Sequence, residues 1–347
     1  MSAATPDTPD SARLAAWLRE HVEPFEGEAV VRKVEGGQSN PTFLVDAGAR
    51  RYVLRRKPVG AILQSAHAVD REYRALKALD GSAVPVPRAR ALCEDPAVLG
   101  SPFYVMDFVD GRILTDQMLP GMTPVQRGAH YAELNRVMAA LHCVDHRAIG
   151  LADYGREERY VARQIERWTR QYRGAETRRI EAMESLIAWL PEHVPDQAGA
   201  GIVHGDFRLD NVIFHATEPR IVAVLDWELS TIGDPLVDFA YHCLSWRLAL
   251  GTHRTLVGVS DAELAALGIP TEAEHVAAYC ARTGRGTDGH IENWAFYLAF
   301  NMFRLASIQQ GIARRALDGN ATNSKAQAVA ARVEATATGG WEIAREI

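Results

Sequence analysis

The sequence lacks the features of a secreted, membrane-spanning or nucleic-acid-binding protein. It holds four cysteines in 347 residues, none at a metal-binding spacing, so we expect reduced thiols in a cytoplasmic protein. No apolar run approaches the length of a membrane span. The opening MSAATPDTPD has neither the basic n-region nor the apolar h-region of a signal peptide. The net charge of −6, with scattered basic residues, argues against nucleic acid or an acidic membrane as the partner.

Internal repeats and low-complexity linkers are also missing from the sequence. A hydrophobic content of 47% and a charged content of 24% are ordinary for a globular protein. A chain of this length forms one large domain or two moderate ones. We therefore expect a folded protein whose partner is a small molecule, and the sequence leaves its oligomeric state open.

The first third of the chain has the pattern of a small antiparallel sheet. Asp10 is placed to cap a helix over 11–22. A second helix over 65–79 and a strand over 102–109 come later. Between the two helices lie three short strand-like runs, at 29–34, 42–48 and 50–57. These patterns predict an N-terminal lobe over 1–107, in which one helix packs on a sheet.

Helical periodicity dominates the rest of the chain, over 108–347. Its strongest strands, NVIFH at 211–215 and IVAVLDW at 221–227, are joined by a turn-like ATEPR and predict a hairpin. The sequence therefore predicts an α+β fold with a small antiparallel lobe, a larger helical lobe and a cleft between them.

The stretch IVHGDFRLDNVIF gathers polar side chains between two apolar runs. Asn211 begins one hairpin strand and Asp226 ends the other, so we expect their side chains to lie side by side. Two such oxygen ligands suit Mg²⁺, which takes its remaining ligands from phosphate and water. Asp206 lies on the loop that enters the hairpin and is expected to face whatever stands opposite the metal.

The segments HGDFRLDNVIF and VLDWELSTIGDPLVDFAY, in this order, resemble the signature of the aminoglycoside phosphotransferase family. Within that family they are most similar to the kinase-like domains fused to some acyl-CoA dehydrogenases, and the resemblance runs from about Glu35 to Arg315. It implies a bilobal protein-kinase-like fold with the active site in the cleft. It also implies ATP or GTP as phosphoryl donor, Mg²⁺ as cofactor and a small-molecule hydroxyl as acceptor.

The resemblance assigns roles to individual side chains. Asp206 would orient or deprotonate the acceptor hydroxyl, while Asn211 and Asp226 would hold magnesium. Glu228 is either an outer partner of the metal or a plain surface carboxylate. His204 is expected to fix the loop rather than to react. Three further acidic residues are expected to brace the loop or begin a helix: Asp210, Asp234 and Asp238.

The loop EGGQSN falls between the first two predicted strands, where a phosphate-covering loop belongs. Gly36 and Gly37 would let the backbone approach phosphates closely, and Ser39 and Asn40 would add short donors. The pattern is weak by itself, because two glycines also suit an ordinary hairpin and the GxGxxG of protein kinases is absent.

On the third predicted strand, alternation places Val53 and Arg55 on one face. The resemblance puts Val53 over the base and Arg55 where kinases carry a phosphate-binding lysine. Glu72, on the helix that follows, is expected as the ion-pair partner of Arg55, with an ordinary solvated helix charge as the alternative. The strand over 102–109 resembles the hinge between kinase lobes. There Met106 would gate the pocket, and the backbone of Asp107 and Val109 would bind the base, leaving ATP and GTP undistinguished.

Two departures from protein kinases indicate a small acceptor. Gly205 stands where those enzymes carry an arginine that binds a phosphorylated loop, and Trp227 and Glu228 follow the metal aspartate. Seven residues separate Asp226 from Asp234, too few for a peptide-docking loop.

Arginines recur in the predicted helices. Arg304 lies within an apolar helix, and four more occur at helical spacing: Arg159, Arg163, Arg167 and Arg170. They form either a solvated cationic face or a site for an anionic acceptor such as a coenzyme A derivative. They argue against polycationic aminoglycosides as acceptors.

Two other classes of function compete with a kinase. Arg55 and the missing third glycine are compatible with a nucleotide-binding pseudokinase or scaffold, although Asp206, Asn211 and Asp226 are all in place. A metallohydrolase built on His204 is weaker, because no second histidine lies at ligand spacing.

Overall fold

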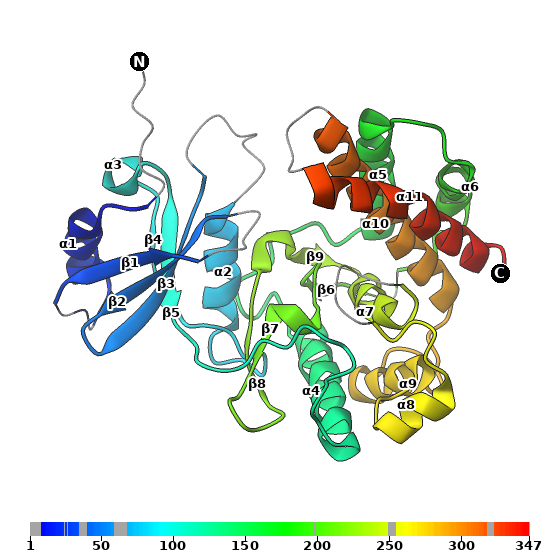
Figure 1. Cartoon of the computed structure of the whole chain (residues 1–347), viewed down its shortest axis with the longest axis horizontal. Coiled ribbons are helices and arrows are strands. Elements are labelled where there is room, and N and C mark those ends of the chain that lie inside the picture. The colour runs from blue at the N-terminus through cyan, green and yellow to red at the C-terminus, as the bar shows by residue number, and fades with distance from the viewer. Residues whose placement is uncertain are drawn as a thin grey trace. The chain divides into compact units, whose positions relative to one another are not determined.

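The structure, a computed structural model of the chain, describes residues 8–23, 25, 27–34, 40–58, 68–197, 199–248, 255–317 and 323–346. Its residues group into two compact units (Figure 1). The first unit comprises Met1–Ile113, Arg147–Tyr154 and Asn211–Ser230. The second comprises Leu114–His146, Gly155–Asp210 and Thr231–Ile347.

The first unit is built on a five-stranded antiparallel sheet in the order β1-β2-β3-β5-β4. The strands are β1 (Ala29–Lys33), β2 (Thr42–Ala47), β3 (Arg50–Arg56), β4 (Ala89–Cys93) and β5 (Phe103–Asp107). The predicted three-strand meander is confirmed, with Thr42 paired to Arg55 and Ala47 to Arg50. Strand β4 was not predicted, because Pro85 and Pro87 just before it suggested irregular chain.

Helices cover both faces of this sheet. Helix α1 (Ser11–His21) begins as predicted at Asp10, whose carboxylate accepts from the Arg13 amide at 2.9 Å. It packs with the short α3 (Pro96–Leu99) on the core face, to which Tyr52, Leu54 and other buried strand residues point. Helix α2 (Val69–Leu79) lies on the opposite face (Figure 1). Val53 and Arg55 therefore face the side of the sheet that carries α2.

The predicted hairpin is present and belongs to the first unit. Strands β7 (Val212–Phe214) and β8 (Ile221–Val224) pair antiparallel, and β8 also bonds Pro85 through the Val224 amide at 2.8 Å. Strand β8 ends earlier than predicted, because Asp226 adopts a left-handed conformation with φ 64° and a 3₁₀ turn follows over Trp227–Leu229. Glu228 therefore lies in this turn and not on strand β8.

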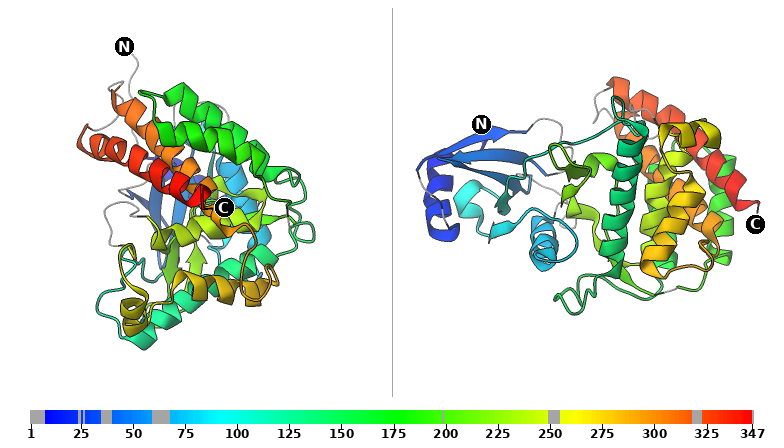
Figure 2. Two further views of the ribbon diagram at one scale, coloured as in Figure 1. Left: turned by 90° about the vertical axis from the view of Figure 1, so that its right-hand side faces the viewer. Right: turned by 90° about the horizontal axis from the view of Figure 1, so that it is seen from below.

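The second unit is mostly helical. Its helices are α4 (Pro124–Cys143), α5 (Tyr160–Ala175), α6 (Glu181–Trp189), α7 (Pro235–Cys243), α8 (Asp261–Leu267), α9 (Glu272–Thr283), α10 (Trp294–Leu317) and α11 (Asn323–Ala344). Helices α10 and α11 run side by side (Figure 2). A two-stranded sheet of β6 (Gly201–Val203) and β9 (Thr231–Gly233) was not predicted, since each strand has only three residues. No helix within the described ranges is long and apolar enough to cross a membrane.

Helix α7 is the centre of the second unit, and all nine of its residues are buried. Asp234 caps it as predicted, accepting from the Leu236 amide at 2.9 Å. Phe239 stacks on Tyr279 of α9 with ring centroids 3.8 Å apart. The predicted α+β fold, an antiparallel N-terminal sheet followed by a mostly helical part, is confirmed.

Candidate functional site

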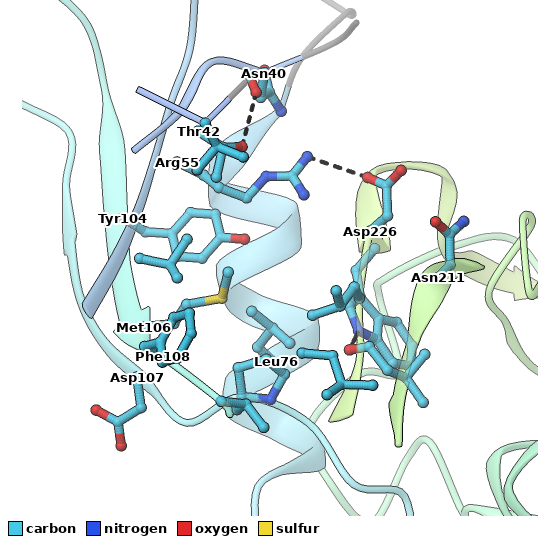
Figure 3. A pocket seen from close by; sticks show the side chains of 18 of the residues that line it. Asn40, Thr42, Arg55, Leu76, Tyr104, Met106, Asp107, Phe108, Asn211 and Asp226 are labelled. Carbon is cyan, nitrogen blue, oxygen red and sulfur yellow. Dashed lines mark hydrogen bonds and ion pairs between the residues drawn. The ribbon is translucent and has the colours of Figure 1, made fainter. Parts of the chain in front are cut away.

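The first unit contains a pocket of about 330 Å³ lined by the sheet, by the segment after β5 and by the β7–β8 hairpin (Figure 3). Several predicted site residues line it: Asn40, Val53, Arg55, Met106, Asp107, Val109, Asn211 and Asp226. Gly36, Gly37 and Ser39 lie outside the described residues. Asp206 belongs to the second unit.

One part of the pocket is apolar. Val53 of β3 and Met106 of β5, which are paired across the sheet, supply one side. The hairpin supplies Ile213, Val224 and Leu225. Such walls suit a flat, largely apolar group.

The Asp107 side chain takes no part in this pocket. Its carboxylate points away (Figure 3) and accepts from Nε and Nη2 of Arg90, both at 2.6 Å. The Asp107 side chain is therefore not available to a molecule bound in this pocket.

The other part of the pocket is charged. Arg55 Nε lies 3.0 Å from Glu72 Oε2, so the predicted ion pair is confirmed. Arg55 Nη2 also donates to Asp226 Oδ1 at 3.2 Å (Figure 3). A planar guanidinium can thus engage two carboxylates at once, whereas a lysine ammonium is a single point charge.

Glu72 is fully buried and receives further hydrogen bonds. The Asn40 amide donates to Oε1 at 2.6 Å, and the Tyr104 hydroxyl donates to Oε2 at 2.9 Å. Burial raises the pKa of Glu72 to about 7, although Arg55 and both of these donors favour the charged form. The sequence prediction missed Tyr104; its signal was alternation along β5, which puts it on the same face as Met106.

Asn211 and Asp226 meet at the hairpin end of the pocket, as predicted (Figure 3). A backbone bond from the Leu225 amide to the Asn211 carbonyl, 2.8 Å long, brings their two segments together. The described residues contain no cluster of three or more His, Cys, Asp or Glu side chains able to hold a metal. This pair offers two hard oxygens, a donor set that fits Mg²⁺ completed by phosphate and water.

Helix α2 is tied to the turn that follows Asp226. Arg71 Nη2 donates to the Tyr154 carbonyl at 2.7 Å and to the Ser230 carbonyl at 3.3 Å. The Tyr154 hydroxyl lies 2.6 Å from Ser230 Oγ, and the Arg71 guanidinium lies 4.2 Å from the Tyr154 ring centroid. No sequence pattern predicted this cluster, which holds the helix that carries Glu72 in place.

The loop containing Asp206 is held within the second unit. The Tyr241 hydroxyl donates to Asp206 Oδ1 at 2.8 Å, and Arg208 Nε lies 3.0 Å from the same oxygen. Arg208 also pairs with Asp210 at 3.4 Å, which agrees with a bracing role for Asp210. His204 is fully buried, and its Nδ1 accepts from the Asp206 amide at 3.2 Å, as a structural histidine should.

Asp238 is the buried anchor of this loop. Its carboxylate accepts from the amides of His204 at 2.6 Å and Gly205 at 2.9 Å. Burial opposes the charge, yet the hydrogen bond with His142 and the neighbouring donors hold the pKa of Asp238 below its ordinary value. The predicted bracing role of Asp238 therefore has a geometric basis.

The arginines divide into two groups. Arg304 is 8% exposed and donates to the Gly205 carbonyl at 2.7 Å, so it supports the loop. Arg167 and Arg170 are exposed on α5, and Arg159 is exposed just before it. Arg163 is half-buried and donates to the Arg156 carbonyl. This exposed group remains compatible with either a solvated face or an anion site.

Comparison with known proteins gives a family match. A model of the phosphotransferase enzyme family (APH) matches residues 30–280. Acyl-CoA dehydrogenase family member 10 of Mus musculus is 45% identical over 318 residues, covering 92% of the chain but only 29% of that relative. The chain thus spans less than a third of this relative's length.

Solved structures give a corresponding result. A putative aminoglycoside phosphotransferase from Ralstonia eutropha JMP134 is 51% identical with a TM-score of 0.88, over 97% of this chain and 99% of that one. A thermostable aminoglycoside phosphotransferase mutant in ternary complex with ADP and hygromycin B is 18% identical with a TM-score of 0.59. That likeness covers 94% of this chain and 97% of the other, and it concerns the fold alone.

Proposed function

Because the chain belongs to the phosphotransferase enzyme family, we propose that it transfers the γ-phosphoryl group of ATP or GTP to the hydroxyl of a small molecule. The observation that carries this proposal is the pocket of the first unit. Its apolar walls end at a buried Arg55–Glu72 pair and at the oxygens of Asn211 and Asp226. This combination suits a nucleoside triphosphate, which is flat and weakly polar at one end and strongly anionic at the other.

The base would occupy the apolar part of the pocket. Val53 would cover one face of the base and the hairpin side chains the other, with Met106 limiting the depth. The backbone of Asp107 and Val109 would supply hydrogen bonds to its edge. A loop of Gly36, Gly37, Ser39 and Asn40 covering the phosphates remains a prediction.

The charged part would hold the phosphates. Arg55, kept in place by Glu72, would bind phosphate oxygens, while Asn211 and Asp226 would bind Mg²⁺. When bound, Mg²⁺ neutralises charge that develops between the β- and γ-phosphates.

Asp206 would complete the reaction. The acceptor oxygen forms a bond to the γ-phosphorus, the bond from that phosphorus to the bridging oxygen breaks, and the nucleoside diphosphate leaves. The hydroxyl proton passes to the Asp206 carboxylate. Assistance of this kind is typically worth about 10²–10⁴-fold in rate.

For the acceptor we propose a hydroxyacyl-coenzyme A or another anionic metabolite. The exposed arginines near α5 and the similarity to a relative named as an acyl-CoA dehydrogenase support this class. The name of the Ralstonia structure favours aminoglycosides instead, but polycations call for acidic surroundings.

The alternative is a nucleotide-binding scaffold without turnover. Arg55 at the position of the kinase lysine is the observation that favours it.

A phosphate-transfer screen tests these proposals. ATP or GTP with Mg²⁺ is offered together with hydroxylated acyl-coenzyme A thioesters, aminoglycosides or amino alcohols, and phosphorylated products are measured. We expect transfer to the thioesters. Transfer to aminoglycosides alone would overturn the anionic-acceptor proposal, and no transfer to any class would favour the scaffold.

Two variants separate binding from turnover. Asp226→Ala should abolish the increase in Tm that Mg²⁺ and nucleotide produce, whereas Asp80→Ala, at an exposed acid of the same unit, should retain it. Asp206→Asn should retain the Tm increase and lose turnover. If Asp206→Asn turned over normally, the base assignment would be wrong.

A further inference from the structure

One face of helix α7 holds four consecutive residues of the Asp206 loop. Asp238, Tyr241 and His242 are spaced three and four residues apart, so their side chains share that face. Asp238 accepts from the amides of residues 204 and 205, and the His242 ring packs edge-on against the Phe207 ring with centroids 5.7 Å apart. Between them, Tyr241 bonds the side chain of residue 206. Of these contacts, only the one made by Tyr241 reaches the carboxylate itself.

The Tyr241 ring is buried and packs against Arg304 of helix α10. Tyr241 is 7% exposed, and the guanidinium of Arg304 lies 5.0 Å from its ring centroid. Arg304 also donates to the Gly205 carbonyl, so the ring is packed between α10 and the loop that it contacts. A rotation of the Tyr241 side chain would disturb this stacking, and its hydroxyl therefore has a defined direction.

We propose that Tyr241 is a positioning residue for phosphoryl transfer, whose hydroxyl fixes the orientation of the Asp206 carboxylate toward the acceptor. This inference rests on the proposed function. Oδ1 of Asp206 accepts a hydrogen bond from the Tyr241 hydroxyl and forms an ion pair with Arg208, whose Nε lies 3.0 Å away; these two contacts on one oxygen restrict rotation of the carboxylate. Arg208 is a third exposed, so the buried tyrosine is the more rigid of the two. Small misplacements of a reacting group lower rates strongly.

The chemistry of a phenol suits this role. A neutral donor orients the carboxylate without cancelling its charge, whereas a second cation would weaken it as a base. Burial and the adjacent Asp206 raise the pKa of Tyr241 above its ordinary value, so the hydroxyl stays protonated. Tyr241 therefore acts as a donor and does not itself accept the acceptor's proton.

The first test is the Tyr241→Phe variant. Two reactions are assayed: transfer to the acceptor found in the screen, and transfer to water, which releases inorganic phosphate from ATP in the presence of Mg²⁺. We expect kcat to fall by about 10- to 100-fold, the value of a hydrogen bond to a charged group. The KM for ATP should change by less than about 2-fold, because Tyr241 is not among the residues that line the proposed nucleotide pocket. Tyr172→Phe is the matched control, since among the described residues the buried Tyr172 hydroxyl has no hydrogen-bond partner.

The second test asks whether Tyr241 acts through Asp206. In an Asp206→Asn background, Tyr241→Phe should cause no further loss of turnover, whereas general damage to the loop would add to the loss. Tyr241→4-aminophenylalanine keeps a donor and should restore much of kcat. Tyr241→4-methoxyphenylalanine keeps the oxygen without its proton and should not restore kcat. Comparing these two variants also tests the proposal if Tyr241→Phe folds poorly.

The outcomes separate this inference from the proposed function. Normal kcat in Tyr241→Phe, with an active wild type, would refute the positioning role alone. Additive losses in the Asp206→Asn background would do the same. A wild type that releases no phosphate and transfers none to any acceptor would refute the proposed function, and the positioning role with it.

Discussion

The Arg55→Met variant tests the charged end of the pocket most directly. It removes the guanidinium but keeps an extended side chain. Arg55 lies 3.0 Å from Glu72 Oε2 and 3.2 Å from Asp226 Oδ1, and its side chain is only 12% exposed. At an effective dielectric constant of about 20, opposite charges at such distances attract by about 5 kcal/mol. Because desolvation offsets part of this attraction, removing one partner of a buried pair costs about 3–5 kcal/mol.

The cost should depend on pH through Glu72. The pKa of this carboxyl is about 7 in the folded protein, against an ordinary value of 4.5. A group whose pKa is raised by folding contributes stability that is complete below the unfolded pKa and is lost as the pH rises through the folded one. At pH 5 Glu72 is mostly protonated and needs no cation, whereas at pH 8 it is ionised. Without Arg55, Glu72 can take up a proton at pH 8, which limits the pH-dependent part of the loss to about 1.4 kcal/mol. Arg55→Met should therefore cost about 3–5 kcal/mol at pH 8 and up to about 1.4 kcal/mol less at pH 5.

Urea unfolding at the two pH values provides the assay. The free energies of unfolding of wild type, Arg55→Met and Arg55→Met/Glu72→Gln are compared. The double variant should recover most of the loss at pH 8, because its buried amide is neutral. Equal losses at both pH values, or a double variant as unstable as the single one, would refute this account of the pair.

Two further predictions concern packing and a buried histidine. Gly111→Ala should destabilise the protein by about 1–3 kcal/mol, because a Cβ there would lie 2.3 Å from the Phe214 carbonyl oxygen. A decrease in the free energy of unfolding in urea of less than about 0.5 kcal/mol would contradict this packing. Burial lowers the pKa of His242 to about 4 from its ordinary 6.5, so the stability that it contributes is complete above pH 6.5 and is lost as the pH falls toward 4. The free energy of unfolding of wild type, measured relative to that of His242→Gln, should fall by about 3 kcal/mol between pH 7 and pH 4. If the two free energies differed by the same amount at both pH values, the histidine would not be held neutral.

Much of the fold and part of the site were predictable from local pattern. Alternation along β3 correctly placed Val53 and Arg55 on the pocket face, and the helix that follows correctly supplied Glu72. Turn chemistry predicted the hairpin that joins Asn211 to Asp226. The family resemblance read from the two motifs is also confirmed, by the match over residues 30–280. These features depend on neighbours in sequence or on adjacent strands, which leave a periodic signal.

Other features were decided only by the tertiary structure. Strands β6 and β9 form because distant three-residue segments pair, and neither has a pattern of its own. Tyr154 reaches Ser230, 76 residues away, and Tyr241 reaches Asp206, 35 residues away. Arg304, which the sequence left open as an anion-binding residue, instead supports the Gly205 carbonyl. A side chain's partner across such distances depends on how whole helices and loops pack, and no local periodicity encodes that packing.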